Sequence, residues 1–173
     1  MLRLIPFLIL AFSGCTTKSP KHKITVNEGL EKPDIMAIDS LFSDTSIIDG
    51  FLVTDDSTSL WYSNSGTRLN YCECLLERDS LRVIVGVNAI FDGVFSEFRI
   101  KDGYFNSSTS ISSCLEGQYK PSISSELSLN SYEYIVGDTV IGEFKNSGFV
   151  SEIDLTKRMK LEGKFQCIIR NPN

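Results

Sequence analysis

The side chains that could do chemistry in this 173-residue chain are mainly its five cysteines, since it has a single histidine. Cys15 follows an apolar run near the N-terminus, whereas Cys72, Cys74, Cys114 and Cys167 lie in the rest of the chain. Four such cysteines can form two disulfides in three possible pairings. Sulfur chemistry is therefore the first chemistry to consider.

Cys72 and Cys74 are two residues apart on an expected strand, so their side chains point to the same face of a sheet. A bond between them is awkward, and we expect partners at Cys114 and Cys167. A zinc site with four thiolates is one alternative, although structural zinc sites usually separate paired cysteines by two or more residues. The other alternative is that these cysteines are buried free thiols.

Other catalytic groups are sparse. His22 lies in a segment without apolar periodicity, so neither a Ser–His nor a Cys–His nucleophile pair is expected. The aspartates stand near expected turns, where Asp is common because it bonds its own backbone. The sequence contains no phosphate-binding loop, EF-hand loop or paired-histidine zinc motif. We therefore assign no catalytic residue, metal ligand or cofactor.

Composition and charge narrow the class of protein. The length suits one packed domain, and 42% hydrophobic with 23% charged residues is ordinary for a globular chain. The formal net charge is −5. A nucleic-acid-binding protein needs a basic face to displace counterions from phosphates, so no nucleic-acid partner is expected.

The N-terminus predicts export. Arg3 precedes the apolar run Leu4–Phe12, and small residues follow at Ser13 and Gly14. This order is typical of a secretory signal peptide over residues 1–14. The run has about nine residues, against roughly 20 for a helix that crosses a bilayer.

Ser13-Gly14-Cys15 resembles the lipobox of bacterial lipoproteins. The resemblance implies that Cys15 becomes the first residue of the mature chain and carries acyl chains such as palmitate. Two or more chains anchor a protein stably to a membrane. Many surface-exported lipoproteins carry an acidic cluster after this cysteine, and none follows Cys15. The resemblance therefore implies an outer-membrane anchor that faces the periplasm, and it leaves surface exposure open.

Residues 15–32 are expected to be the lipidated cysteine and a flexible tether, followed by a single β-rich domain over 33–173. One short helix is expected at 33–42, because apolar residues recur there at three- and four-residue spacing. Its apolar positions are Ile35, Ile38, Leu41 and Phe42.

Beyond residue 45 the apolar period becomes two, which predicts antiparallel strands separated by turns. Strands are expected at 47–54, 59–63, 68–76, 80–90, 95–101, 111–119, 131–136, 139–144, 149–155 and 159–169. Turns at 137–138 and 156–158 would join the last four into two hairpins. Without repeated strand–helix alternation, the pattern predicts a mainly β antiparallel barrel or two-layer β-sandwich.

The stretch 150–165, with Gly117-Gln118-Tyr119 and the tyrosines at 132 and 134, resembles small uncharacterised lipoproteins of the Bacteroidetes type. The shared pattern encodes a hairpin that ends in Gly-x-Phe. The resemblance implies a β-rich domain, lipocalin-like or a sandwich, and it transfers no catalytic residue.

These features predict a lipid-anchored binding or accessory module of the cell envelope. Its partner would be a small apolar ligand inside the barrel or another envelope protein. The aromatic residues that could line a pocket, or alternatively form the core, are Trp61, Tyr62, Phe91, Phe95, Phe98, Tyr104 and Phe105. The alternatives are a hydrolase that uses two carboxylates on a glycan or peptidoglycan fragment, and a purely structural envelope protein.

Overall fold

The computed structural model describes residues 21–31, 47–54, 67–88, 92–113, 118–149 and 158–172. The regular elements in these ranges are all strands. They are β1 (His22–Lys23), β2 (Thr25–Val26), β3 (Ile47–Thr54), β4 (Thr67–Arg68), β5 (Tyr71–Glu77), β6 (Ser80–Asn88), β7 (Asp92–Lys101), β8 (Tyr104–Ser113), β9 (Gln118–Pro121), β10 (Ser124–Leu129), β11 (Thr139–Phe149) and β12 (Arg158–Arg170). The expected helix at 33–42 lies outside the described residues.

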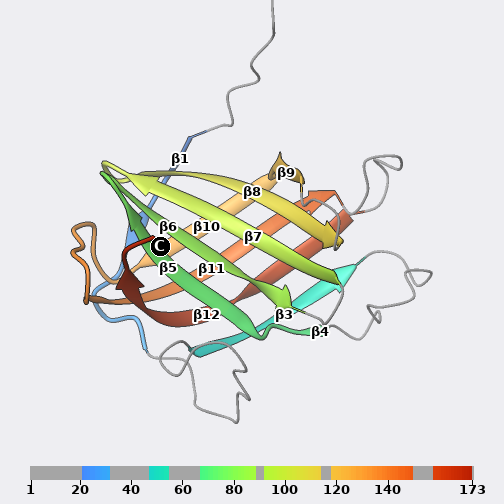
Figure 1. Cartoon of the computed structure of the whole chain (residues 1–173), viewed down its shortest axis with the longest axis horizontal. Helices are drawn as coiled ribbons and strands as arrows, with labels where there is room; N and C mark the ends of the chain where they lie inside the picture. Colours follow the sequence, from blue (N-terminus) through green and yellow to red (C-terminus); the bar gives the residue numbers. More distant parts are fainter. Residues whose placement is uncertain are drawn as a thin grey trace, which may run out of the picture.

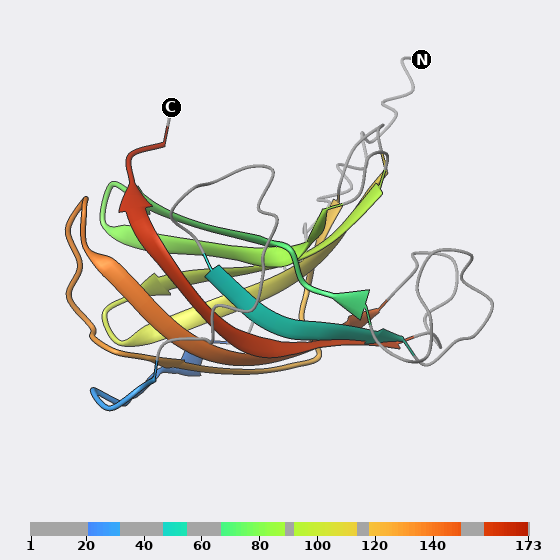
Figure 2. The same ribbon diagram turned by 90° about the horizontal axis from the view of Figure 1, so that it is seen from below.

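The strands form one strongly curved sheet, as the two views show (Figures 1 and 2). The order along the sheet is β1-β8-β7-β6-β5-β12-β11-β10-β2, with β3 and β4 beside β12 and with β9 beside β8. Neighbours pair antiparallel except β5 with β12 and β2 with β10. The domain is therefore mainly β and is a nearly closed barrel.

Two short chain segments close the gap between β8 on one side and β10 and β11 on the other. In the segment from β9 to β10, the Ser122 amide donates to the Ser107 carbonyl at 3.1 Å and the Ile123 amide donates to the Ser147 carbonyl at 2.8 Å. The segment from β1 to β2 bridges the same gap nearer the other end of the barrel, since β1 pairs with β8 and β2 pairs with β10. Between them the Ile24 amide donates to the Gly103 carbonyl at 3.1 Å. We call these two crossings the seam.

The structure differs here from the expectation of a flexible tether over 15–32. Its residues 22–26 supply β1 and β2, and Ile24 between them is only 2% exposed. The His22 ring stacks on Phe105 with centroids 5.1 Å apart. This segment lacks a long apolar period because each strand has two residues and its buried contact depends on one isoleucine.

β12 connects β3 and β5 within the sheet, because it pairs with each of them over a different part of its length. Met159 to Gln166 pair with β3, whereas Ile169 and Arg170 pair with β5. At the sharp approach of β3 to β12, Gly50 lies opposite Gly163. A Cβ on Gly50 would stand 2.4 Å from the Glu162 carbonyl oxygen, so only glycine fits there.

The middle of the interior is filled by aromatic rings from several strands. Phe98 packs against Phe105 and Phe144, with centroids 5.9 and 5.7 Å apart, and Phe144 packs against Phe165 at 6.1 Å. A Cβ on Gly142 would lie 2.4 Å from the Phe165 ring, so this glycine makes room for the ring. Of the two roles expected for the aromatic residues, lining a pocket or forming the core, these contacts assign Phe98 and Phe105 to the core.

Several strand predictions are confirmed, notably β3 over 47–54 and the last strand, β12. The expected hairpin partner of that strand, 149–155, lies outside the described residues beyond Phe149, and β12 pairs antiparallel with β11 over 139–149. The prediction of a strand at 131–136 is wrong, because the partner of β11 is β10 at 124–129. The predicted strand at 111–119 is split, since its start belongs to β8 and its end to β9.

Candidate functional site

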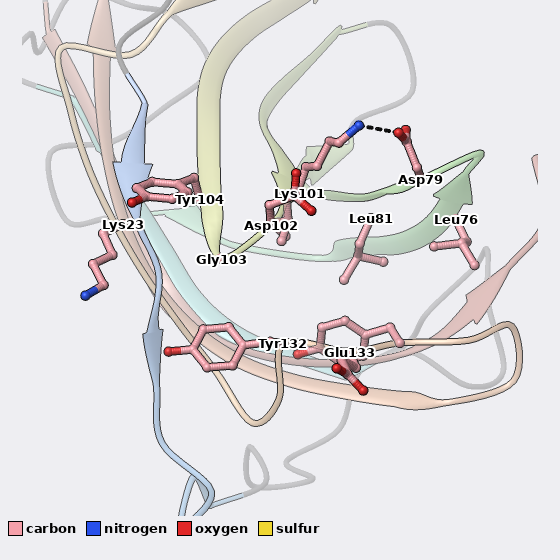
Figure 3. A pocket seen from close by; sticks show the side chains of 12 residues that line it. Lys23, Leu76, Asp79, Leu81, Lys101, Asp102, Gly103, Tyr104, Tyr132 and Glu133 are labelled. Atoms are coloured by element: carbon pink, nitrogen blue, oxygen red, sulfur yellow. Dashed lines mark hydrogen bonds and ion pairs between the residues drawn. The ribbon is translucent and has the colours of Figure 1, made fainter.

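A pocket of about 510 Å³ opens at the end of the barrel where β5 turns into β6 and β7 into β8 (Figure 3). We call this the pocket end. Buried Leu81 and Ile100 contribute apolar surface, and charged side chains and tyrosines stand around them. The lining residues are Lys23, Leu76, Asp79, Leu81, Ile100, Lys101, Asp102, Gly103, Tyr104, Tyr132, Glu133 and Tyr134.

A two-residue turn positions the side of the pocket formed by β7 and β8. Lys101 pairs with Tyr104, and the residues between them, Asp102 and Gly103, have φ of 53° and 77°. Positive φ at both central positions is the geometry that Asp-Gly favours in tight hairpins. The turn therefore fixes Lys101 and Tyr104 on neighbouring strands at the rim.

The turn between β5 and β6 brings a carboxylate to the same rim. Asp79 forms an ion pair with Lys101, drawn as a dashed line in Figure 3. The hydrogen bond from the Lys101 ammonium, and then its positive charge, lower the pKa of the Asp79 carboxyl below its usual value. Asp79 therefore stays ionised at neutral pH.

Residues 130–138, between β10 and β11, hold their shape through local hydrogen bonds. The Tyr134 hydroxyl donates to the Ser131 carbonyl at 2.6 Å, and the Ile135 amide donates to the Asp138 carboxylate at 2.9 Å. The Ile169 amide donates to the Asp138 carbonyl at 3.0 Å, which fastens the loop to β12. Burial raises the pKa of the Tyr134 hydroxyl to about 12.

This fastened loop presents apolar side chains to solvent. Exposure is 53% for Tyr132, 69% for Ile135 and 44% for Val136, and Tyr104 on β8 is 50% exposed. Among the described residues, Ile123 is the other large hydrophobic side chain with high exposure, and it lies between β9 and β10. Exposed apolar groups therefore gather at the pocket end.

The predicted pocket residues have other positions. Phe98 belongs to the core, with no exposed surface. Phe95 lies on β7 edge-on to the Tyr71 ring, with centroids 5.4 Å apart, next to the bare backbone of Gly86. Trp61, Tyr62 and Phe91 lie outside the described residues.

Of the two further aromatic candidates, Phe105 is core and Tyr104 stands at the rim. Tyr132 and Tyr134 also stand at the rim, which their sequence pattern does not indicate because it predicts a strand at 131–136. The signal that could have found them is the Ser131, Asp138 and Gly137 pattern, whose polar side chains and positive φ favour a structured loop.

Three of the five cysteines meet inside the barrel. Cys74 on β5 is bonded to Cys167 on β12, with Cα atoms 5.9 Å apart. Cys72 is a buried free thiol, and the three sulfurs all lie within 4.8 Å of one another. Burial, and to a lesser degree the charge of Glu73, raise the pKa of the Cys72 thiol above its ordinary value.

A disulfide between β5 and Cys167 was expected, and Cys74 forms it. As three thiolates, these cysteines would be suitable ligands for a soft metal ion, but two of the sulfurs are joined in the disulfide. Cys15 and Cys114 lie outside the described residues.

An ion-pair network covers the outer face of β5, β6 and β7. Glu97, 5% exposed, accepts hydrogen bonds from Arg82 at 2.9 Å and from Arg99 at 2.5 Å. Both arginines also reach Glu77, at 3.1 and 3.0 Å. Both carboxylate oxygens of the buried Glu97 have an arginine partner, so we interpret the network as structural rather than reactive.

The described part of the chain contains no helix of the length and apolar character needed to span a membrane. Comparison with protein-family models, with curated proteins and with solved structures yields no match.

Proposed function

We propose that the chain is an exported lipoprotein, anchored to a bacterial membrane through Cys15, that docks an envelope protein partner on the pocket end of its barrel. The outer membrane, with the barrel in the periplasm, is the proposed location. The observation that carries the docking function is the gathering of Tyr104, Tyr132, Ile135 and Val136 at one end of a barrel whose middle is filled.

The filled core argues against storage of an apolar ligand in the middle of the barrel. A site of that kind needs a cavity lined mainly by apolar groups, whereas the Phe98, Phe144 and Phe165 rings pack against one another here. Tyrosines that are half exposed, beside charged groups of both signs, are typical of protein interfaces. The pocket at the rim could then receive one side chain of the partner.

Hydrolysis of a glycan has less support. A glycosidase needs one carboxyl group whose pKa is raised, so that it can donate a proton. The pKa of Asp79 is lowered instead. The described histidine, His22, stacks on Phe105 and does not line the pocket.

The anchor is tested by Cys15→Ser in the chain expressed with its own N-terminus. The unchanged chain should sediment with membranes and carry the mass of its acyl chains. The variant should lose both the added mass and the membrane association. An unchanged variant would contradict the anchor.

The docking function is tested by photo-crosslinking in the intact envelope. A photoreactive residue in place of Tyr132 or Ile135 should give one defined crosslinked protein, whose purified form binds the purified chain. The same residue at Ile123 is the matched control, because it is also exposed but lies away from the pocket end.

Ile135→Asp should then weaken binding at least tenfold, and Ile123→Asp should leave it unchanged. A purely structural protein would give no crosslink at Tyr132 or Ile135. Turnover of peptidoglycan fragments by the purified chain would favour the hydrolase instead.

A further inference from the structure

The buried sulfurs form a site whose chemistry goes beyond partner docking. A free thiol, Cys72, lies beside an existing bond between Cys74 and Cys167, with all three sulfurs within 4.8 Å. Exposure is 7% for Cys72, 1% for Cys74 and 0% for Cys167. Among the described residues, this shielded thiol and disulfide are each other's nearest sulfur partners.

The register of the two strands gives Cys167 two possible partners. β5 and β12 run parallel, and Cys74 pairs with Ile169. Continuing this register back by two residues on each strand places Cys167 opposite Cys72. The existing bond therefore joins Cys74 to a residue two positions before its register partner Ile169, and the free thiol of Cys72 lies within 4.8 Å of both bonded sulfurs.

We propose that Cys72, Cys74 and Cys167 form an exchange site, in which the bond migrates between Cys74 and Cys72 while Cys167 remains the constant partner. Cys72 loses its proton and its thiolate attacks Sγ of Cys167. The bond from Cys167 to Cys74 breaks, and Cys74 leaves as a thiolate that takes up a proton. One disulfide and one thiol are present before and after, so the step needs no oxidant or reductant.

The geometry also selects which sulfur is attacked. Attack on Cys74 would join two residues that stand two apart on one strand, which is an awkward closure. Attack on Cys167 keeps β5 tied to β12 in both forms. The site thus preserves the link between two walls while it changes the cysteine that makes the link.

The test locates the bridge in full-length protein from the envelope. Free thiols are alkylated at acidic pH, and the unreduced chain is cleaved after glutamate, which separates Cys72 from Cys74 because Glu73 lies between them. Mass spectrometry then identifies the peptide joined to Cys167. We expect both linkages in the unchanged chain after incubation at pH 8.5 in mild denaturant.

Three variants make the test decisive. Cys74→Ser should hold a complete bridge from Cys72 to Cys167, Cys72→Ser should keep the bridge from Cys74, and Cys167→Ser should leave both other cysteines open to alkylation under denaturing conditions. Folded Cys74→Ser with two unbonded thiols would overturn the proposal. If that variant does not fold, the unchanged chain decides, because a bridge to Cys74 alone after incubation also overturns it.

Discussion

Two neighbouring layers of the barrel interior share the strands β7, β8 and β11 and differ in chemistry. The aromatic layer consists of Phe98, Phe105, Phe144 and Phe165, and the polar layer consists of Ser96, Ser107, Thr109, Ser122 and Asn146. Two residues along β7 separate Phe98 from Ser96, and two along β11 separate Phe144 from Asn146. Each of these nine side chains is 6% exposed or less.

The two layers are therefore about equally buried, and they differ in how their side chains are hydrogen-bonded. The aromatic layer has only apolar contacts to satisfy. In the polar layer the Asn146 amide donates to the Ser96 hydroxyl at 2.8 Å. Within the described part of the chain, the hydroxyls of Ser107, Thr109 and Ser122 and the Asn146 carbonyl oxygen have no hydrogen-bond partner. Exclusion from solvent alone is therefore not a measure of how much a side chain stabilises the fold.

The largest effect should come from the aromatic layer. Phe144→Ala removes a ring that contacts Phe98 and Phe165, and the cavity left behind should lower the free energy of unfolding by about 3–5 kcal/mol. Urea unfolding of the mature chain measures this loss. Phe144→Leu, which leaves a smaller void, should lose less, and an equal loss would mean that the ring contacts are not what stabilises this layer.

An intermediate effect is expected for the bonded pair of the polar layer. Asn146→Ala leaves the buried Ser96 hydroxyl without its amide donor, so it should cost about 1–2 kcal/mol. The double-mutant cycle with Ser96→Ala should give a coupling of about 1 kcal/mol between the two side chains. Zero coupling would show that the bond contributes nothing and would widen the contrast between the layers.

A smaller effect is expected where a hydroxyl has no partner. Thr109→Val keeps the shape of the side chain and removes the hydroxyl group, so the free energy of unfolding should change by about 0.5 kcal/mol or less, or increase. Thermal unfolding checks this. A loss well above 1 kcal/mol would show that the hydroxyl is bonded to an internal water molecule, and the polar layer would then be satisfied like the aromatic one.

The smallest effect should lie outside both layers, at the exposed pair of Asp79 and Lys101. Because the pKa of Asp79 is lowered on folding, its contribution is present above the unfolded value of about 3.9 and is lost as pH falls through the lowered pKa. Asp79→Asn should remove this acid-side change in the unfolding midpoint. Moderate salt should weaken the change as well, since exposed charges are screened.

The sequence predicted the fold class because strands with clean alternation are common in this chain. In β12, Phe165 and Cys167 alternate with charged or polar neighbours and point inward. The same reasoning failed for β8, whose inward positions include Ser107 and Thr109. An apolar period cannot reveal a strand whose buried residues are polar.

The incorrect prediction of a strand at 131–136 has a different cause. Tyr134, Ile135 and Val136 have high β-propensity, but hydrogen bonds to Ser131 and Asp138 hold them in a loop. The pocket itself could not be predicted, because three distant stretches meet there through the pairing of the strands. The absence of a bond between Cys72 and Cys74 was predictable, since the parity of a strand puts both on one face, but parity could not choose which distant cysteine bonds to this strand.

The seam has a mechanical consequence. β1 and β2 are the first described elements of the chain, and they close the barrel by pairing with β8 and β10. A force that pulls on the chain before His22 therefore reaches the wall at once, through the hydrogen bond from Ile24 to Gly103 and the pairing with β8. Tension at the N-terminus would strain the barrel at its closure before it reached β12.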